Sequence, residues 1–141
     1  MAIKKKEIRD FVSREWLKGQ ILRNRFFEID TKNIRITRRI CTIKPKSPIT
    51  ENGTDQILLH ELNNLITRGY KYFILNLETS GLIGSSDGVV VHIFTKLEKI
   101  GGTIKLCCLN DRTLNKVRLS KLDIVLQIFE TQEEAIDSFR K

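Results

Sequence analysis

The residue types from which metal and catalytic sites are usually built are scarce in this chain. Its 141 residues include three cysteines and two histidines, and none stands at the spacing of a zinc or other metal site. The cysteine count is odd, and Cys107 and Cys108 are adjacent, which argues against a framework of disulfides. We therefore predict that the cysteines are reduced and pack as small apolar residues.

Long apolar runs are missing as well. None approaches the ~20 residues that span a bilayer, and the basic segment 1–7 lacks the apolar core of a signal peptide. Apolar residues make up 40% of the chain and charged residues 30%, which is typical of a soluble globular domain. We expect a cytoplasmic protein without a membrane span, built from one domain with an appendage.

The glycine-rich stretches match no nucleotide-binding or hydrolase motif. Gly81 and Gly84 fit neither the Walker loop nor the dinucleotide-binding fingerprint. Gly84 and Gly88 have the spacing of a nucleophile elbow, but no Asp followed by His comes after them, and His92 is the only later histidine. The other histidine, His60, has no second ligand near it. We expect no enzymatic activity, no cofactor and no metal.

Positive charge is concentrated in the first third of the chain. The net charge is +8, yet residues 1–46 hold 14 Lys and Arg against 5 Asp and Glu. The remaining residues hold 11 against 12. This distribution predicts a near-neutral domain with a basic N-terminal segment.

The basic segment itself leaves two interpretations open. Residues 4–26 lack proline and carry apolar residues at roughly helical spacing, so we predict a helix there. Its second apolar side, at Leu17 and Ile21, indicates contact with the domain, a second subunit or a partner. We favour such packing, since Trp16 stands among scattered apolar residues and base-stacking motifs are absent. Contact with nucleic acid, an acidic partner or an anionic membrane surface is the alternative.

Beyond residue 32, segments of strand and helix character alternate. Expected strands cover residues 33–43 (as one or two strands), 72–77, 103–109 and 123–129. Expected helices cover residues 54–68 and 89–100, a short stretch capped by Asn110 or Asp111, and a last segment opened by the capping box from Thr131 to Glu134. This order predicts an α/β fold with a mainly parallel or mixed sheet and helical crossovers. We divide the chain into an N-terminal helical extension, 1–32, and a domain, 33–141.

The turn between the strand 72–77 and the helix 89–100 is the most informative stretch. Small residues that join a buried strand to a helix start can present hydroxyl groups and hold a phosphate against free N–H groups. A phosphate on Ser85 would be favoured by the helix dipole, and Ser86 is the less favoured acceptor. The other interpretation is that Ser85 and Ser86 cap the helix, with Asp87 in its first turn.

Several segments of this pattern occur together in a known family. They are Phe73–Leu77, Gly81–Gly88, the helix end Ile100–Gly102, Thr103–Cys108, and the tail segments Leu122–Val125 and Phe129–Ile136. Over about residues 33–140, the chain resembles the STAS domain of the anti-anti-sigma factors. The resemblance implies a STAS-like fold and a regulatory role in a partner-switching pathway.

In that family, an anti-sigma kinase phosphorylates a serine in an Asp-Ser-Ser/Thr-Gly turn, and the unphosphorylated domain binds this kinase so that a sigma factor is released. The resemblance implies Ser85 as the phosphorylated residue and an anti-sigma factor or serine kinase-like protein as the partner. Gly84 stands where the family has Asp, and Asp87 where it has Gly. The implied partner-binding residues are Gly84, Ser85, Ser86, Asp87, Gly88 and Lys96.

Two other functions remain open. One is an assembly or scaffold protein of the same fold that is never phosphorylated and that uses its basic N-terminal segment to form oligomers or to dock. The other is a nucleic-acid-binding protein that works through residues 4–39, which we consider less favoured.

Overall fold

A computed structural model describes residues 22–23, 27–35, 38–46, 49, 53–82 and 87–140. These residues form a sheet of six strands whose spatial order, β1-β2-β3-β4-β5-β6, is also their order along the chain. The strands are β1 (Leu22–Arg23), β2 (Phe27–Arg35), β3 (Arg38–Pro45), β4 (Tyr72–Asn76), β5 (Thr103–Cys107) and β6 (Ile128–Phe129). β1, β2 and β3 pair antiparallel, whereas β3 to β6 pair parallel. The expected mixed α/β sheet is therefore confirmed.

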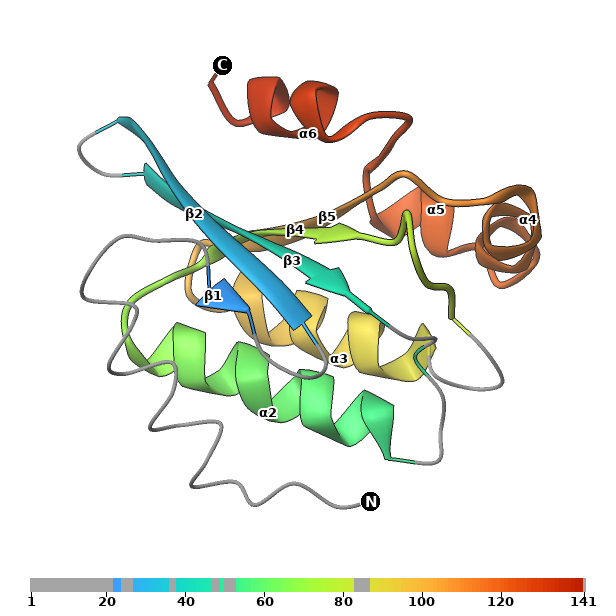
Figure 1. Ribbon diagram of the computed structural model, residues 1–141, viewed down its shortest axis with the longest axis horizontal. Coiled ribbons are helices and arrows are strands. Elements are labelled where there is room, and N and C mark those ends of the chain that lie inside the picture. Colours follow the sequence, from blue (N-terminus) through green and yellow to red (C-terminus); the bar gives the residue numbers. More distant parts are fainter. Residues whose placement is uncertain are drawn as a thin grey trace.

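Helices cover both faces of this sheet (Figure 1). They are α2 (Thr54–Thr67), α3 (Asp87–Glu98), α4 (Asp111–Leu119), α5 (Leu122–Val125) and α6 (Gln132–Ser138). α2 and α3 lie on one face and α6 lies on the other, while α4 and α5 stand at one end of the sheet (Figure 1). The middle of β4 is apolar on both sides because both faces are covered: Phe73 and Leu75 face the larger core, and Ile74 faces the smaller one beneath α6.

Several helices begin or end at the capping residues and glycines expected from the sequence. Gly69 and Gly101, which follow α2 and α3, have φ values of 96° and 80°, the left-handed conformation that glycine adopts without strain. Asn110 caps α4 by accepting a hydrogen bond from the Thr113 N–H group at 2.8 Å. The Thr131 hydroxyl caps α6 in the same way, accepting from the Glu134 N–H group at 3.2 Å.

The prediction of a strand at residues 123–129 is wrong over most of that segment. The chain forms the single-turn helix α5 there, and only Ile128–Phe129 joins the sheet. Lys121, with a φ of 61°, turns the chain sharply after α4, and a 2.7 Å hydrogen bond from the Leu126 N–H group to the Leu122 carbonyl closes the helical turn. β-branched residues such as Ile124 favour strands in general, but here they lie on an exposed turn.

The N-terminal expectations are tested only in part. Residues 1–21 and 24–26 of the expected helix lie outside the described residues. Leu22–Arg23, which we placed near the helix end, instead forms β1 and pairs with β2. The expected strand region at 33–43 is an antiparallel hairpin of β2 and β3, and β2 runs through the boundary expected at residue 32. No helix in the described part of the chain has the length and apolar character needed to cross a membrane.

Candidate functional site

The candidate phosphorylation turn connects the carboxyl end of β4 to the first turn of α3. Gly84, Ser85 and Ser86 lie outside the described residues, which resume at Asp87, the first residue of α3. Gly88 follows, is exposed, and has no atom within 4 Å of the position that a Cβ atom would take. Gly88, in the first turn of α3, is therefore open to solvent.

Two segments that are distant in sequence fix the approach to this turn. The Ile49 N–H group donates to the Gly81 carbonyl at 2.8 Å, and Ile49 forms a parallel bridge with Leu82. On the other side, a Cβ atom on Gly81 would lie 2.7 Å from Thr113 Oγ1, so only glycine allows the start of α4 to come this close. The sequence analysis did not connect Thr113 with the turn, because no local pattern signals such a long-range contact.

The segment after β4 is also held on the α6 side of the sheet. Asn76 Oδ1 accepts a hydrogen bond from the Glu78 N–H group at 2.9 Å, and Asn76 Nδ2 donates to Gln132 Oε1 at 2.7 Å. Lys44 Nζ lies 2.9 Å from Glu78 Oε2, and this hydrogen bond raises the pKa of Lys44. The chain thus leaves β4 along a fixed path before it enters the turn.

The outer face of α3 continues the surface that begins at Gly88. Val91, His92 and Thr95 are exposed on this helix and Lys99 is exposed directly after it, whereas Val90, Ile93 and Leu97 pack into the core. The exposed residues recur at intervals of three or four, so they form one stripe along the helix. A protein that binds the turn can extend its contact along this stripe.

Lys96, the remaining residue of the predicted site, lies away from the turn. It belongs to the last turn of α3, ~13 Å along the helix axis from Asp87. Its Nζ atom donates to Asn63 Oδ1 of α2 at 2.6 Å. Among the predicted binding residues, the structure therefore brings Asp87 and Gly88 together at the start of α3 and places Lys96 at the other end of the same helix.

A model of the STAS domain family matches residues 31–135. The chain belongs to this family. A protein of Thermotoga maritima, provisionally named an anti-sigma factor antagonist, is 26% identical over 80 residues, or 56% of this chain and 71% of that protein. The resemblance seen in the sequence motifs is thereby confirmed.

Solved structures of STAS-fold proteins superpose on this STAS domain. A crystal structure from Thermotoga maritima, also provisionally named an anti-sigma factor antagonist, has a TM-score of 0.73 at 20% identity and covers 82% of this chain and 95% of its own. SpoIIAA of Bacillus in its phosphorylated form has a TM-score of 0.59 at 22% identity and covers 79% and 99%. At these identities the structures establish a shared fold.

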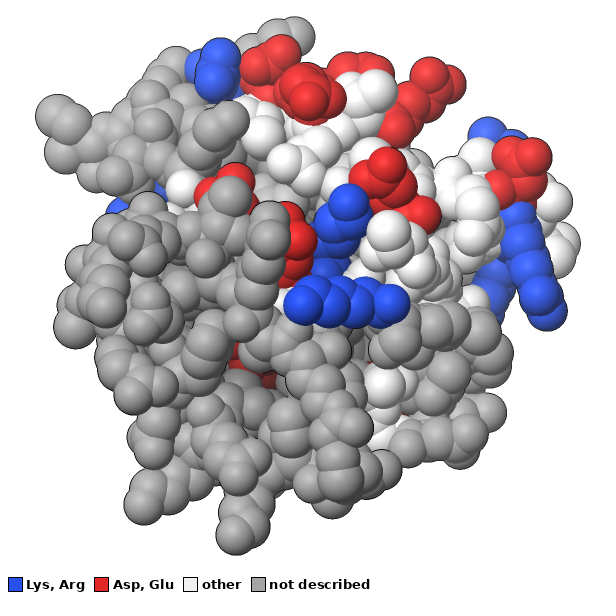
Figure 2. Space-filling view, viewed as in Figure 1, with Lys and Arg blue, Asp and Glu red and all other residues white. Residues whose placement is uncertain are grey.

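The cysteines and histidines in the described part of this STAS domain form no metal-binding cluster. Cys41 and Cys107 are buried, and burial raises the pKa of both thiols, which leaves them in the unreactive protonated form. His60 is half-buried on α2, and the described residues hold no cluster of three His, Cys, Asp or Glu that could bind a metal. Figure 2 shows acidic side chains gathered over α6, on the face opposite α2 and α3.

Proposed function

We propose that this STAS domain is a cytoplasmic regulatory module of the anti-sigma factor antagonist type and that phosphorylation of Ser85 controls its binding to an anti-sigma factor or serine kinase-like partner. The observation that carries the proposal is the open start of α3. Gly88 and the exposed residues Val91, His92, Thr95 and Lys99 lie on or directly after the helix that follows the candidate serine in the chain. Relatives named as anti-sigma factor antagonists support the class of function.

The physical basis of the switch is the charge that a phosphate adds. A phosphoserine carries a charge of about −2, and the N-terminus of a helix stabilises such a charge through its dipole and free N–H groups. α3 has 12 residues and begins immediately after the candidate serines. Phosphorylation would therefore change the partner surface without unfolding the domain. That SpoIIAA has been solved in a phosphorylated form supports the same chemistry on this fold.

The first test is the intact mass of the protein purified from its native host, followed by mapping of the peptide that contains Ser85. We expect a fraction of the protein to be heavier by one phosphate, about 80 Da, on Ser85, and this fraction to have lost a partner that co-purifies with the unmodified form. Ser85→Ala should retain the partner permanently, and Ser85→Glu should release it. Ser120→Ala is the matched control, because Ser120 lies on the exposed end of α4. Partner release that is unchanged in Ser85→Ala would refute the switch.

A second candidate is an assembly protein of the same fold that is never phosphorylated. The presence of Gly84 and Asp87 at positions where the family carries Asp and Gly favours it. Here the unmodified protein would co-purify with one partner at full occupancy. Removal of residues 1–21, which spares β1 and β2, should then abolish assembly while the circular dichroism spectrum of the domain is retained.

A further inference from the structure

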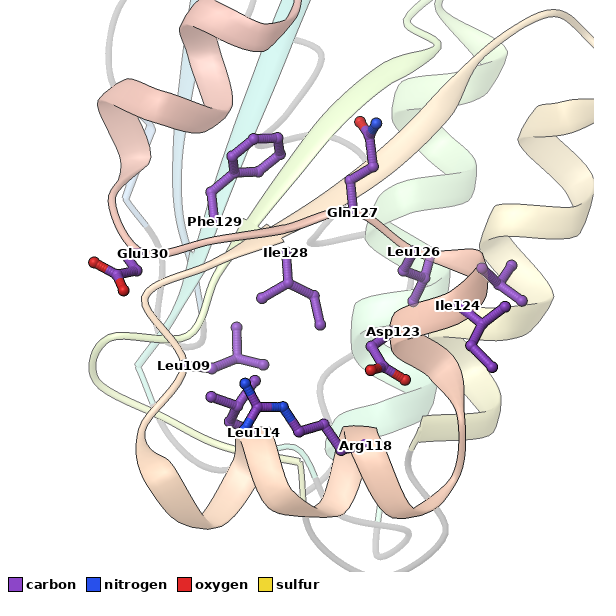
Figure 3. Close-up of a pocket in the computed structure, with 11 residues that line it drawn as sticks. Leu109, Leu114, Arg118, Asp123, Ile124, Leu126, Gln127, Ile128, Phe129 and Glu130 are labelled. Atoms are coloured by element: carbon purple, nitrogen blue, oxygen red, sulfur yellow. The ribbon is translucent and has the colours of Figure 1, made fainter.

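A hollow of about 600 Å³ lies where β6, α4 and α5 meet (Figure 3). Leu109, Leu114 and Ile128 supply apolar side chains to it, and Arg118 enters it from α4. Its volume is within the range of sites that bind ligands, ~300 to ~1,000 Å³.

The hollow follows the free edge of the sheet. Its lining includes four consecutive residues, Gln127 to Glu130, although successive side chains of a strand point to opposite faces. A hollow in contact with all four must therefore run along the edge of the strand. β6 is the last strand of the sheet, with β5 as its neighbour on one side.

The main-chain groups of β6 alternate between the β5 side and this free edge. The carbonyls of Gln127 and Phe129 accept hydrogen bonds from the N–H groups of Leu106 and Cys108, at 3.0 and 3.1 Å. The N–H and C=O groups of successive residues in a strand point to opposite sides, so those of Ile128 point away from β5. They form the kind of open strand edge to which another chain can add.

The part of the hollow formed by α5 includes exposed apolar side chains. Ile124 and Val125 line it with 77% and 52% of their surface exposed. Exposed apolar side chains that gather at one place mark protein-binding surfaces.

Arg118 supplies the charge that selects the ligand. Its side chain reaches across the hollow toward Leu114 (Figure 3). Two acidic residues, Asp123 and Glu130, also line the hollow, and the Glu130 carboxylate points away from Arg118. None of the described acidic residues forms an ion pair with Arg118. A guanidinium group placed in this way pairs best with a carboxylate, which it can bind through two hydrogen bonds.

We propose that an extended segment of a partner protein binds in this hollow as an added strand beside β6, with apolar side chains against Leu114, Ile124 and Val125 and an acidic side chain on Arg118. The edge from Gln127 to Glu130 is ~13 Å long and accommodates about four residues, so binding is weak and reversible. The hollow shares no residue with the surface proposed around Ser85. A partner held here therefore stays bound while the turn exchanges another.

The test is an NMR titration of the full-length ¹⁵N-labelled protein with the acetylated and amidated pentapeptide Ile-Thr-Glu-Thr-Ile. Its alternate residues place two apolar side chains and one carboxylate on the same face. We expect the amide signals of residues 127–130 and the Arg118 Nε signal to shift as the peptide is added. The analogue with Lys in place of Glu should bind at least about tenfold more weakly. A fully N-methylated analogue, which lacks main-chain donors, should not bind.

Variants separate this site from other surfaces. Arg118→Gln should weaken binding of the Glu peptide about tenfold and should not weaken binding of the Lys analogue, because it removes a positive charge. Arg112→Gln, on the exposed start of the same helix, is the matched control and should bind like the wild type. The proposal is overturned if residues 127–130 show no shift at millimolar peptide, if the shifts fall on α3 instead, or if the Lys and Glu peptides bind equally well.

Discussion

The Nζ atom of Lys105 lies 4.0 Å from the ring centroid of Phe139, beneath α6. The same ammonium group donates to Ser138 Oγ at 2.7 Å, and Lys105 is 8% exposed. A lysine on β5 thus holds the last helix to the sheet through a cation–π contact and a charge-assisted hydrogen bond.

Replacement of this lysine should loosen α6. Lys105→Met retains the apolar stem and removes the charge, so we expect the free energy of unfolding to fall by about 1–3 kcal/mol. Urea denaturation followed by circular dichroism measures this loss. Lys99→Met, in the exposed turn directly after α3, is the control and should change stability by less than ~0.5 kcal/mol. A Lys105→Met protein as stable as the control would show that the ammonium group contributes nothing to the docking of α6.

Glu61 of α2 should make stability depend on pH. It is 0% exposed, neither carboxyl oxygen has a hydrogen-bond partner, and burial raises its pKa from 4.5 to about 8. The folded state therefore binds more protons than the unfolded chain between these pH values, so stability falls as the pH rises through this window. The Glu61 contribution is fully present below about pH 4.5 and is lost as the pH rises through about 8, with a slope of at most about 1.4 kcal/mol per pH unit.

Glu61→Met tests this dependence. We expect the variant to be more stable than the wild type by about 1–3 kcal/mol near pH 8, because it buries no unpaired polar group. The difference should shrink toward pH 5, where the wild-type carboxyl is neutral in the folded protein. Unfolding free energies measured in urea across this range give both curves, and Glu98→Met, on an exposed helix end, controls for the added methionine. Parallel curves for the wild type and Glu61→Met would contradict the assignment.

Replacement by alanine should change the stability in opposite directions at two glycines. A Cβ atom on Gly102 would overlap the main-chain carbonyl of Lys71, so Gly102→Ala should lower the stability by about 3 kcal/mol or more. A Cβ atom on Gly88 would meet no atom, and Gly88→Ala should raise stability by about 0.5 kcal/mol because alanine favours the helix. Thermal unfolding of both variants tests the pair. Equal melting temperatures would contradict the close approach of Gly102 to Lys71.

Lys96 offers a way to separate binding from stability. Its hydrogen bond to Asn63 is exposed, so Lys96→Gln should change the free energy of unfolding by less than ~0.5 kcal/mol. If Lys96 contributes to the partner surface, the same variant should bind the co-purifying partner several-fold more weakly, as calorimetry would measure. Asn63→Ala removes the same hydrogen bond from the α2 side and is the control. Equal losses of affinity in the two variants would assign the effect to the link between α2 and α3.

Local patterns in the sequence were sufficient to identify most elements of the fold. The apolar stripe of α2, the continuous apolar run of β4 and the cap at Asn110 are each set by residues close together in the chain. α5 was missed because Ile124 and Val125 favour a strand by composition, and only their exposure in the folded chain distinguishes the helical turn. Periodicity carries no information about such exposure when an element is a single turn long.

The surroundings of the candidate site were less accessible to prediction. The turn itself follows from a buried strand that leads into a helix start. Its supports, Ile49 and Thr113, and the Gln132 amide that holds Asn76, come from three separate segments of the chain. Only tertiary packing brings these residues together, so their spacing in the sequence does not predict the contacts.

The correspondence between strand order in the sheet and strand order in the chain has a consequence for biosynthesis. Each new strand leaves the ribosome next to a strand that has already been made, so the sheet can grow by addition at one side with short loop closures. The face that bears Ile40, Ile74 and Cys107 is covered only by Ala135, Ile136 and Phe139, which follow all six strands in the chain. A nascent chain that stops short of α6 therefore presents an uncovered apolar face, and this side of the sheet is closed only when α6 docks on it.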